Sequence, residues 1–106
     1  MKPGNLRNRV TLQQLTRTDD GAGGYTETWT AIATVWADVY PLKGNERYQA
    51  QQVQANLSHR VTIRYRAGVK PSMRLQYGTR TLNIEAVIDP EERHRELVLM
   101  CSEVAV

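Results

Sequence analysis

The clearest hydrophobic pattern in the chain has a period of two and runs from Leu57 to Arg66. Apolar side chains and one histidine occupy every second position, and polar side chains lie between them. Only a β-strand sends successive side chains to opposite faces, so the pattern predicts a strand with one buried face. The buried set is Leu57, His59, Val61, Ile63 and Tyr65, and the polar set includes Arg60, Arg64 and Arg66.

Shorter runs of the same kind predict more strands on both sides of this one. They cover residues 9–16, 25–29, 33–40, 73–77, 80–88 and 96–102, with turn residues between most of them. In the run 33–40, Trp36 and Tyr40 alternate with valines, so both faces of that strand are expected to be covered. In the run 80–88, the alternation of Leu82, Ile84 and Ala86 marks the inward face.

A cluster of Asp and Gly residues separates the first two runs and predicts a hairpin with a long loop near residues 17–25. No Lys-Ser/Thr pair and no helix follow this cluster, so a phosphate-binding loop is not indicated. We expect the loop to be flexible at Asp19, Asp20, Gly21, Gly23 and Gly24.

One helix is predicted near residues 45–56, where Asn45 is a suitable N-cap. Ala50, Val53 and Leu57 form a thin apolar stripe, so the helix should touch the core lightly. Gln51 and Gln52 belong to a glutamine-rich face that is either solvated or a subunit contact. About six short strands with one helix, in a single domain over residues 1–106, predict a mainly β fold: a small antiparallel barrel or sandwich.

Composition adds little to this fold but narrows the function. Eleven of the 14 cationic residues are Arg, and the net charge is only +3. Arginine enters interfaces more readily than lysine, although codon bias would give the same excess. The single cysteine, Cys101, excludes an internal disulfide framework. With no long apolar run, a non-secreted chain without membrane contact is expected.

No arrangement of residues predicts catalysis, a cofactor or a metal site. The two histidines, His59 and His94, and Cys101 are scattered and lack ligand spacing. His59 lies on an inward face, where a hydrogen-bonded core histidine is expected rather than a base. The sequence therefore favours a binding or structural protein over an enzyme.

Nucleic-acid binding is the alternative that the arginines suggest. Arg60, Arg64 and Arg66 form a basic row that Arg74 and Arg80 would extend on adjacent strands. Binders of single strands interleave such residues with exposed aromatic side chains. Because Tyr65 and Tyr77 fall on the apolar faces, the aromatic part of such a surface is missing, and a small nucleic-acid-binding barrel is the second choice.

An ordered set of short motifs resembles the head–tail joining (head–tail adaptor, or stopper) family of tailed bacteriophages. The resemblance spans residues 4–103. It rests on Leu6-Arg7-x-Arg9-Val10, Trp29, Trp36-Ala37-x-Val39-x-Pro41-Leu42-x-Gly44-x-Glu46, Ala50, His59-Arg60-Val61-x-Ile63-Arg64-Tyr65, Met73-Arg74, Ile84, Val87-Ile88-Asp89-Pro90 and Arg95-Glu96-Leu97.

The resemblance implies a small barrel that assembles as a ring at the head–tail interface of a virion, made in the bacterial cytoplasm. The ring would close the DNA exit channel and offer a docking surface to the tail. The implied partners are copies of itself, the portal or adaptor protein, a tail-terminator or other tail protein and, non-specifically, packaged double-stranded DNA. Candidate contacts are Arg60, Arg64, Arg66, Gln51 and Gln52.

Overall fold

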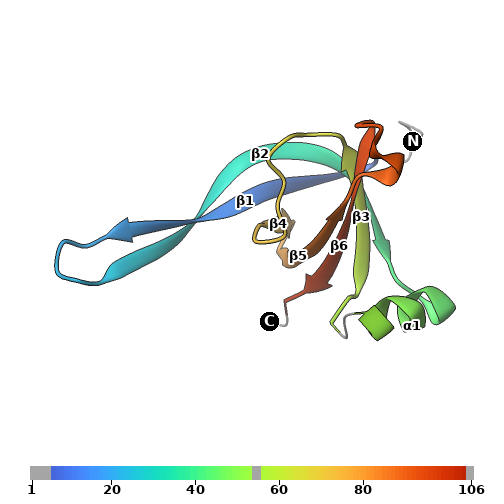
Figure 1. Ribbon diagram of the computed structural model, residues 1–106, viewed down its shortest axis with the longest axis horizontal. Coiled ribbons are helices and arrows are strands. Elements are labelled where there is room, and N and C mark those ends of the chain that lie inside the picture. The colour runs from blue at the N-terminus through green and yellow to red at the C-terminus, as the bar shows by residue number, and fades with distance from the viewer. Residues whose placement is uncertain (1–5, 54–55, 105–106) are drawn as a thin grey trace.

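Six strands pair into one closed antiparallel barrel in the computed structural model, which describes residues 6–53 and 56–104 (Figure 1). Around the barrel the order is β1–β2–β3–β6–β5–β4, and β4 closes the sheet by pairing with β1. The mainly β barrel predicted from the sequence is thus confirmed. The strands are β1 (Asn8–Asp19), β2 (Tyr25–Pro41), β3 (His59–Arg64), β4 (Arg74–Tyr77), β5 (Arg80–Ile88) and β6 (Glu96–Glu103).

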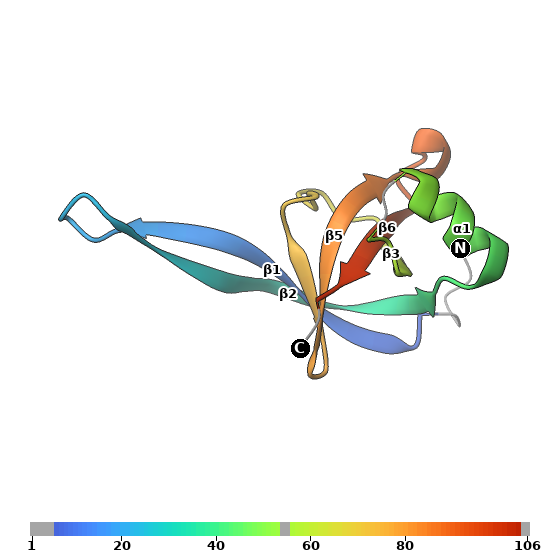
Figure 2. The same cartoon turned by 90° about the horizontal axis from the view of Figure 1, so that it is seen from below.

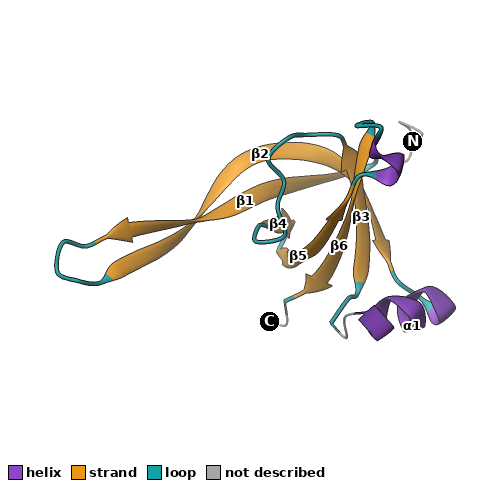
Figure 3. Cartoon of the chain, in the orientation of Figure 1, coloured by secondary structure: helices purple, strands orange, loops and turns teal. Residues whose placement is uncertain are grey.

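Two helical segments accompany the strands (Figure 3). Helix α1 (Gly44–Val53) joins β2 to β3 across one end of the barrel, and the short 3-10 turn η2 (Pro90–Glu92) joins β5 to β6. The backbone N–H of Leu42 donates to the carbonyl of Ser58 over 2.9 Å, and this bond joins the two ends of the segment that contains α1. Of the predicted helix, residues 54–55 and the side chains of Glu46 and Val53 lie outside the described residues.

The barrel interior is a single core built from alternate residues of all six strands. Barrels of this size are filled by side chains rather than hollow. The alternation predicted for His59, Val61 and Ile63 is confirmed, since all three side chains are buried, and Tyr77 packs against the core. The core residues are Val10, Leu12, Ala37, Val61, Ile63, Met73, Leu75, Leu82, Ile84, Leu97, Leu99 and Cys101.

A long two-stranded hairpin extends from the barrel and makes the molecule 49 Å long but only 27 Å across (Figure 2). We call residues 14–30 the β-arm; its strand pairs run from Gln14–Thr30 to Asp19–Tyr25. The predicted loop at 17–25 is therefore too long, because only residues 20–24 leave the strands. An ion pair between Arg17 and Glu27, at 3.2 Å, helps the two strands to stay paired almost to the tip.

The separate strands predicted at 25–29 and 33–40 are in fact one strand, β2. No Gly or Pro interrupts residues 30–32, and the irregularity is absorbed by a β-bulge. Leu12 pairs with Ala33 and Gln13 with Ala31, which leaves Ile32 as the extra residue.

Two other expectations about the strands are wrong in detail. The central strand covers His59–Arg64 only, and Tyr65 beyond it is exposed and stacks against His94 with ring centroids 4.5 Å apart. On β5, a bulge after Ile84 changes the alternation, so Val87 rather than Ala86 packs against the core.

Core and arm should respond very differently to truncation. Leu99 is fully buried between its cross-strand partners Val61 and Val87. Leu99→Ala should lower the free energy of unfolding by about 2–5 kcal/mol, measured by urea denaturation, because it leaves a cavity in the core. Thr28→Ala, on the exposed β-arm, should change it by less than about 0.5 kcal/mol. Equal losses for both variants would contradict this division of stability.

Candidate interaction surfaces

The β-arm has two unlike faces. Residues that pair across an antiparallel ladder share a face, and successive residues alternate. One face carries Leu15 opposite Trp29 and Arg17 opposite Glu27; the other is made of Gln14 and threonines. The hydroxyls of Thr16 and Thr30 lie 3.1 Å apart on that second face. The arm therefore offers one aromatic face and one hydroxyl-rich face.

Four arginines stack on four aromatic side chains along the outer face of β2. The distances from guanidinium carbon to ring centroid are between 4.1 and 5.0 Å, which is close enough for a cation–π attraction. We call this set the arginine–aromatic row. Its pairs are Arg17–Tyr25, Arg74–Trp29, Arg9–Trp36 and Arg60–Tyr40.

The bulge at Ile32 puts these four aromatic residues on one face. Trp29 and Trp36 are seven positions apart, an odd number that would place them on opposite sides of a regular strand. The extra residue shifts the alternation, so Trp29 lies opposite Leu15 and Trp36 opposite Arg9, both on the outward-facing side of β1. The second face of residues 33–40, expected to be covered, is open instead: Trp36 is 51% and Tyr40 38% exposed.

The predicted arginine row holds only for Arg60 and Arg64, which share the outward face of β3. Arg60 lies on β3 and stacks on Tyr40, Arg64 is the last residue of β3, and Arg66 is in the loop that follows. Arg74 and Arg80 do not extend it, because Arg74 covers Trp29 and Arg80 turns to the opposite end of the barrel. Arg64 and Arg66 do meet Trp36, Val35 and Tyr65 around a shallow groove of about 320 Å³.

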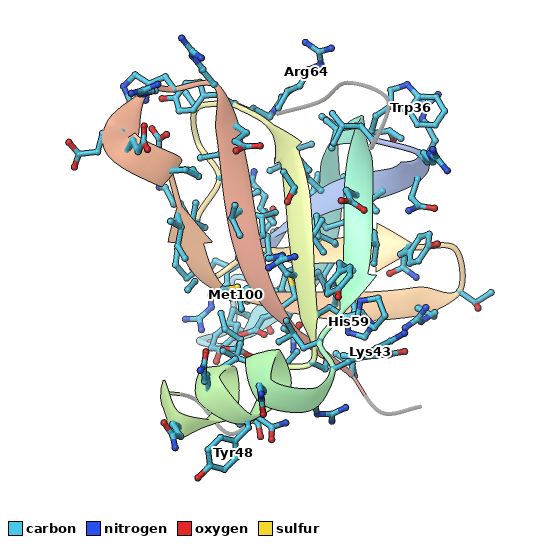
Figure 4. The ribbon with its side chains drawn as sticks, turned by 90° about the vertical axis from the view of Figure 1, so that its right-hand side faces the viewer. Trp36, Lys43, Tyr48, His59, Arg64 and Met100 are labelled. Atoms are coloured by element: carbon cyan, nitrogen blue, oxygen red, sulfur yellow. The ribbon has the colours of Figure 1, made fainter. Side chains whose placement is uncertain are left out.

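The two glutamines lie far from that groove. Figure 4 shows Trp36 and Arg64 at one end of the barrel and α1 with His59 at the other. The Gln51 amide donates to the carbonyl of Leu57 over 3.3 Å, which gives this side chain a structural role, whereas Gln52 is exposed. No signal in the sequence indicated that the candidate contacts divide between two ends.

The arm tip is closed by its two aspartates. Asp19 Oδ1 accepts from the N–H of Gly21 over 2.9 Å, and Asp20 Oδ1 accepts from the N–H groups of Ala22 and Gly24 over 2.8 and 3.1 Å. Such Asx turns, with glycines at positive φ (Gly21 78°, Gly23 85°), define the turn's shape. Flexibility at these residues remains a prediction.

A polar cluster occupies the α1 end of the barrel. Arg80 donates two bonds to Glu103, at 2.8 and 2.9 Å, and its NH2 group lies 3.1 Å from Nε2 of His59. The other ring nitrogen of His59 lies 2.8 Å from the Ser58 hydroxyl. Burial and then the neighbouring Arg80 lower the pKa of His59, while the hydrogen bond from Arg80 lowers the pKa of Glu103.

The cluster does not form a nucleophilic site, although His59 lies directly opposite Cys101 on β6. Burial raises the pKa of the Cys101 thiol to about 12, and its Sγ lies 3.5 Å from the carbonyl of Leu99. A nucleophilic cysteine needs the opposite shift. Since Arg80 donates to Nε2 of a neutral His59, this imidazole is a buried structural group, as predicted.

The lowered pKa of His59 should make stability depend on pH. Below pH 6.5, the ordinary pKa of histidine, His59 takes up a proton in the unfolded chain but stays neutral in the folded chain. The free energy of unfolding should therefore fall as the pH drops below 6.5, until the pH reaches the lower pKa of His59 in the folded chain. The contribution of Glu103 to stability is lost at lower pH, below the ordinary glutamate pKa of 4.5. In His59→Gln, melting temperature should vary less just below pH 6.5. Parallel curves for the variant and the wild type would contradict this origin.

Within residues 6–53 and 56–104, no group of three or more His, Cys, Asp or Glu side chains is placed to hold a metal ion. The same part of the chain contains no helix long and apolar enough to cross a membrane.

Comparison with known proteins shows which family the chain matches and which solved structures share its fold. Residues 1–104 match the family described as phage head completion protein. Head completion protein gp7 of Enterobacteria phage HK97 is 34% identical over 89 residues, which cover 79% of this chain and 80% of gp7. Head completion protein gp16 of Bacillus phage SPP1 is 31% identical over 68 residues, which cover 64% of this chain and 62% of gp16.

Two solved structures share the fold. The solution structure of protein SF1141 from Shigella flexneri 2a has a TM-score of 0.78 and 32% identity, and the match covers 99% of this chain and 98% of that one. A chain in the virion of the native gene transfer agent particle has a TM-score of 0.64 and 24% identity over 95% and 97% of the two chains. The family match over nearly the whole chain confirms the resemblance that the motifs predicted. The chain belongs to the phage head completion protein family, and is a structural, non-enzymatic component of the phage virion.

Proposed function

We propose that the protein assembles as a ring at the junction of head and tail, where it closes the DNA exit channel and gives the tail a docking surface. The observation that carries this proposal is the β-arm. The barrel fills its own core and closes its own sheet, but residues 14–30 extend from it with apolar side chains exposed, among them Tyr25 at 59% and Leu15 at 37%.

An arm of this kind is suited to contact with another protein. An isolated two-stranded hairpin is at best marginally stable in water. β1 pairs with β4 only from Thr11 to Gln13, and β2 pairs with β3 only from Ala37 to Pro41. Beyond these pairs the outer backbone edges of both arm strands have no partner strand in the described chain, and such edges readily accept further contacts.

The remaining candidate contacts fit a subunit that lies between two partners. Arg64 and Arg66 lie at one end of the barrel, and Gln52 on α1 lies at the other (Figure 4). In this proposal Arg64 and Arg66 contact a neighbouring copy or the portal or adaptor protein, and the α1 end contacts another virion protein. Arg60 lies between them on the barrel wall, where it would meet a neighbouring copy.

The arginine–aromatic row gives one specific reason to keep nucleic-acid binding as the second candidate. The sequence suggested that exposed aromatic residues are missing, yet Trp36, Tyr40 and Tyr65 are exposed. However, guanidinium groups already cover Trp36 and Tyr40 on one side, which reduces the ring surface on which bases can stack. We therefore expect DNA contact to be incidental to assembly.

DNA binding by the free protein separates these two candidates. The isolated protein should bind double-stranded DNA weakly, and binding should vanish near roughly 0.15 M salt, because few phosphates are neutralised. Fluorescence anisotropy with a labelled duplex measures this. Tight binding that persists at this salt concentration and depends on Arg60 and Arg64 would favour the nucleic-acid-binding barrel.

Removal of the β-arm tests the proposed role. Replacing residues 14–30 by a two-residue Asn-Gly turn keeps every barrel strand pair and removes the exposed apolar surface. The variant should unfold at nearly the wild-type urea midpoint, yet heads completed with it should fail to gain tails or retain DNA. Tail attachment is counted by electron microscopy of heads that lack the native protein.

A matched control keeps the arm and alters only its hydroxyl-rich face. Thr16→Ser retains the hydroxyl that faces Thr30 and should support tail attachment at the wild-type level. If the arm-deleted protein joins heads to tails as well as this control does, the role of the arm is wrong.

A further inference from the structure

The groove next to Trp36 is an open, cationic, aromatic site. Its lining residues are Val35, Trp36, Arg64, Tyr65 and Arg66. Trp36 is 51% and Tyr65 39% exposed, and neither arginine has an acidic side chain within 4.0 Å in the part of the chain that the structure describes. Arginine and tryptophan are enriched among residues that dominate binding energy in protein interfaces.

The tip of the β-arm has the complementary properties. Asp19 and Asp20 bring two negative charges, and the turn beyond them consists of Gly21, Ala22, Gly23 and Gly24. One oxygen of each carboxylate closes the turn, while the second has no hydrogen-bond partner among the described residues. The result is a narrow hairpin end with two exposed carboxylates, small enough to approach a groove of about 320 Å³.

Within one molecule these two surfaces cannot meet. The tip is at the far end of the 49 Å long axis (Figure 1), whereas Trp36 and Arg64 are seen on the barrel from the opposite side (Figure 4). A projection at one end and a matching groove at the other form a heterologous pair of surfaces. Such pairs link copies head to tail and give a ring when the rotation closes.

We propose that the arm tip of one copy docks in the Trp36 groove of the next copy, with Asp19 and Asp20 paired to Arg64 and Arg66. The glycine-rich turn then lies over Trp36 and Tyr65, where larger side chains would be excluded. This inference rests on the proposed ring, and it names the contact that builds it. It assigns Arg64 and Arg66 to a neighbouring copy rather than to the portal.

Cross-linking between two proteins that each carry one exposed, introduced cysteine tests the contact. Ala22 lies in the tip, and Ala67 follows Arg66; both are exposed, whereas the native Cys101 is fully buried. Heads are completed with an equal mixture of the Ala22→Cys and Ala67→Cys proteins, carrying different tags, and treated with a short bis-maleimide. The expected product joins one tag to the other, because each contact combines a tip with a groove.

Charge variants establish the chemistry of the contact. Asp19→Asn with Asp20→Asn removes both charges but keeps the oxygens that close the turn. This double variant, made in the Ala22→Cys protein, should lower the yield of the mixed product about tenfold or more. Arg64→Gln with Arg66→Gln, made in the Ala67→Cys protein, should lower it to a similar extent. In both cases the charges of the other partner are left unpaired in the interface. Arg93→Gln, an exposed arginine outside the groove, is the matched control and should leave the yield unchanged.

The outcomes separate this inference from the proposed function. If the heads gain tails but no mixed product forms, or if the tip reacts only with another virion protein, the tip-to-groove contact is wrong while the joining role stands. If the charge variants do not lower the yield of the mixed product, the pairing of Asp19 and Asp20 with Arg64 and Arg66 is wrong. If wild-type protein supplied to the same heads fails to attach tails, the proposed function itself is wrong.

Discussion

Closure of the barrel depends on a very short contact, the three residue pairs that join β1 to β4. Thr11, Leu12 and Gln13 pair with Gln76, Leu75 and Arg74, and without them the sheet would have two open edges. Leu12 and Leu75 meet in the core at this seam, and Arg74 donates to the Gln13 side chain over 2.7 Å on its outer side. A few buried contacts thus determine whether the fold is a barrel or an open sheet.

The same short seam explains the arm. β1 has 12 residues and β2 has 17, whereas β4 has only four, so most of the hairpin continues after its barrel partners have ended. Arg74 and Trp29 stack at 4.1 Å where the arm leaves the barrel. Anchored there, the arm is held away from the body, which is the geometry that a subunit needs to reach a neighbour.

The hydrophobic pattern and turn residues of the sequence predicted those parts of the fold that depend on neighbouring residues alone. Period-two alternation identified the inward faces of β3 and β4, and the Gly and Asp cluster identified the hairpin. The two bulges were not predictable, because Ile32 looks like an ordinary strand residue and becomes the extra one only through pairing with β1. The arginine–aromatic row was missed for the same reason. The groove was missed because it brings Trp36 together with Arg64 and Arg66, which are far apart in sequence.

We propose that the barrel is complete in the free chain and that the arm acquires its partner only in the particle. Amide hydrogen exchange of β-arm residues 14–30, in the free protein and in completed heads, measures this most directly, with β3 and β6 as the internal reference. We expect rapid exchange of the arm in the free protein, strong protection of the arm in heads, and slow exchange of β3 and β6 in both. Equal exchange of the arm in the two states would contradict it.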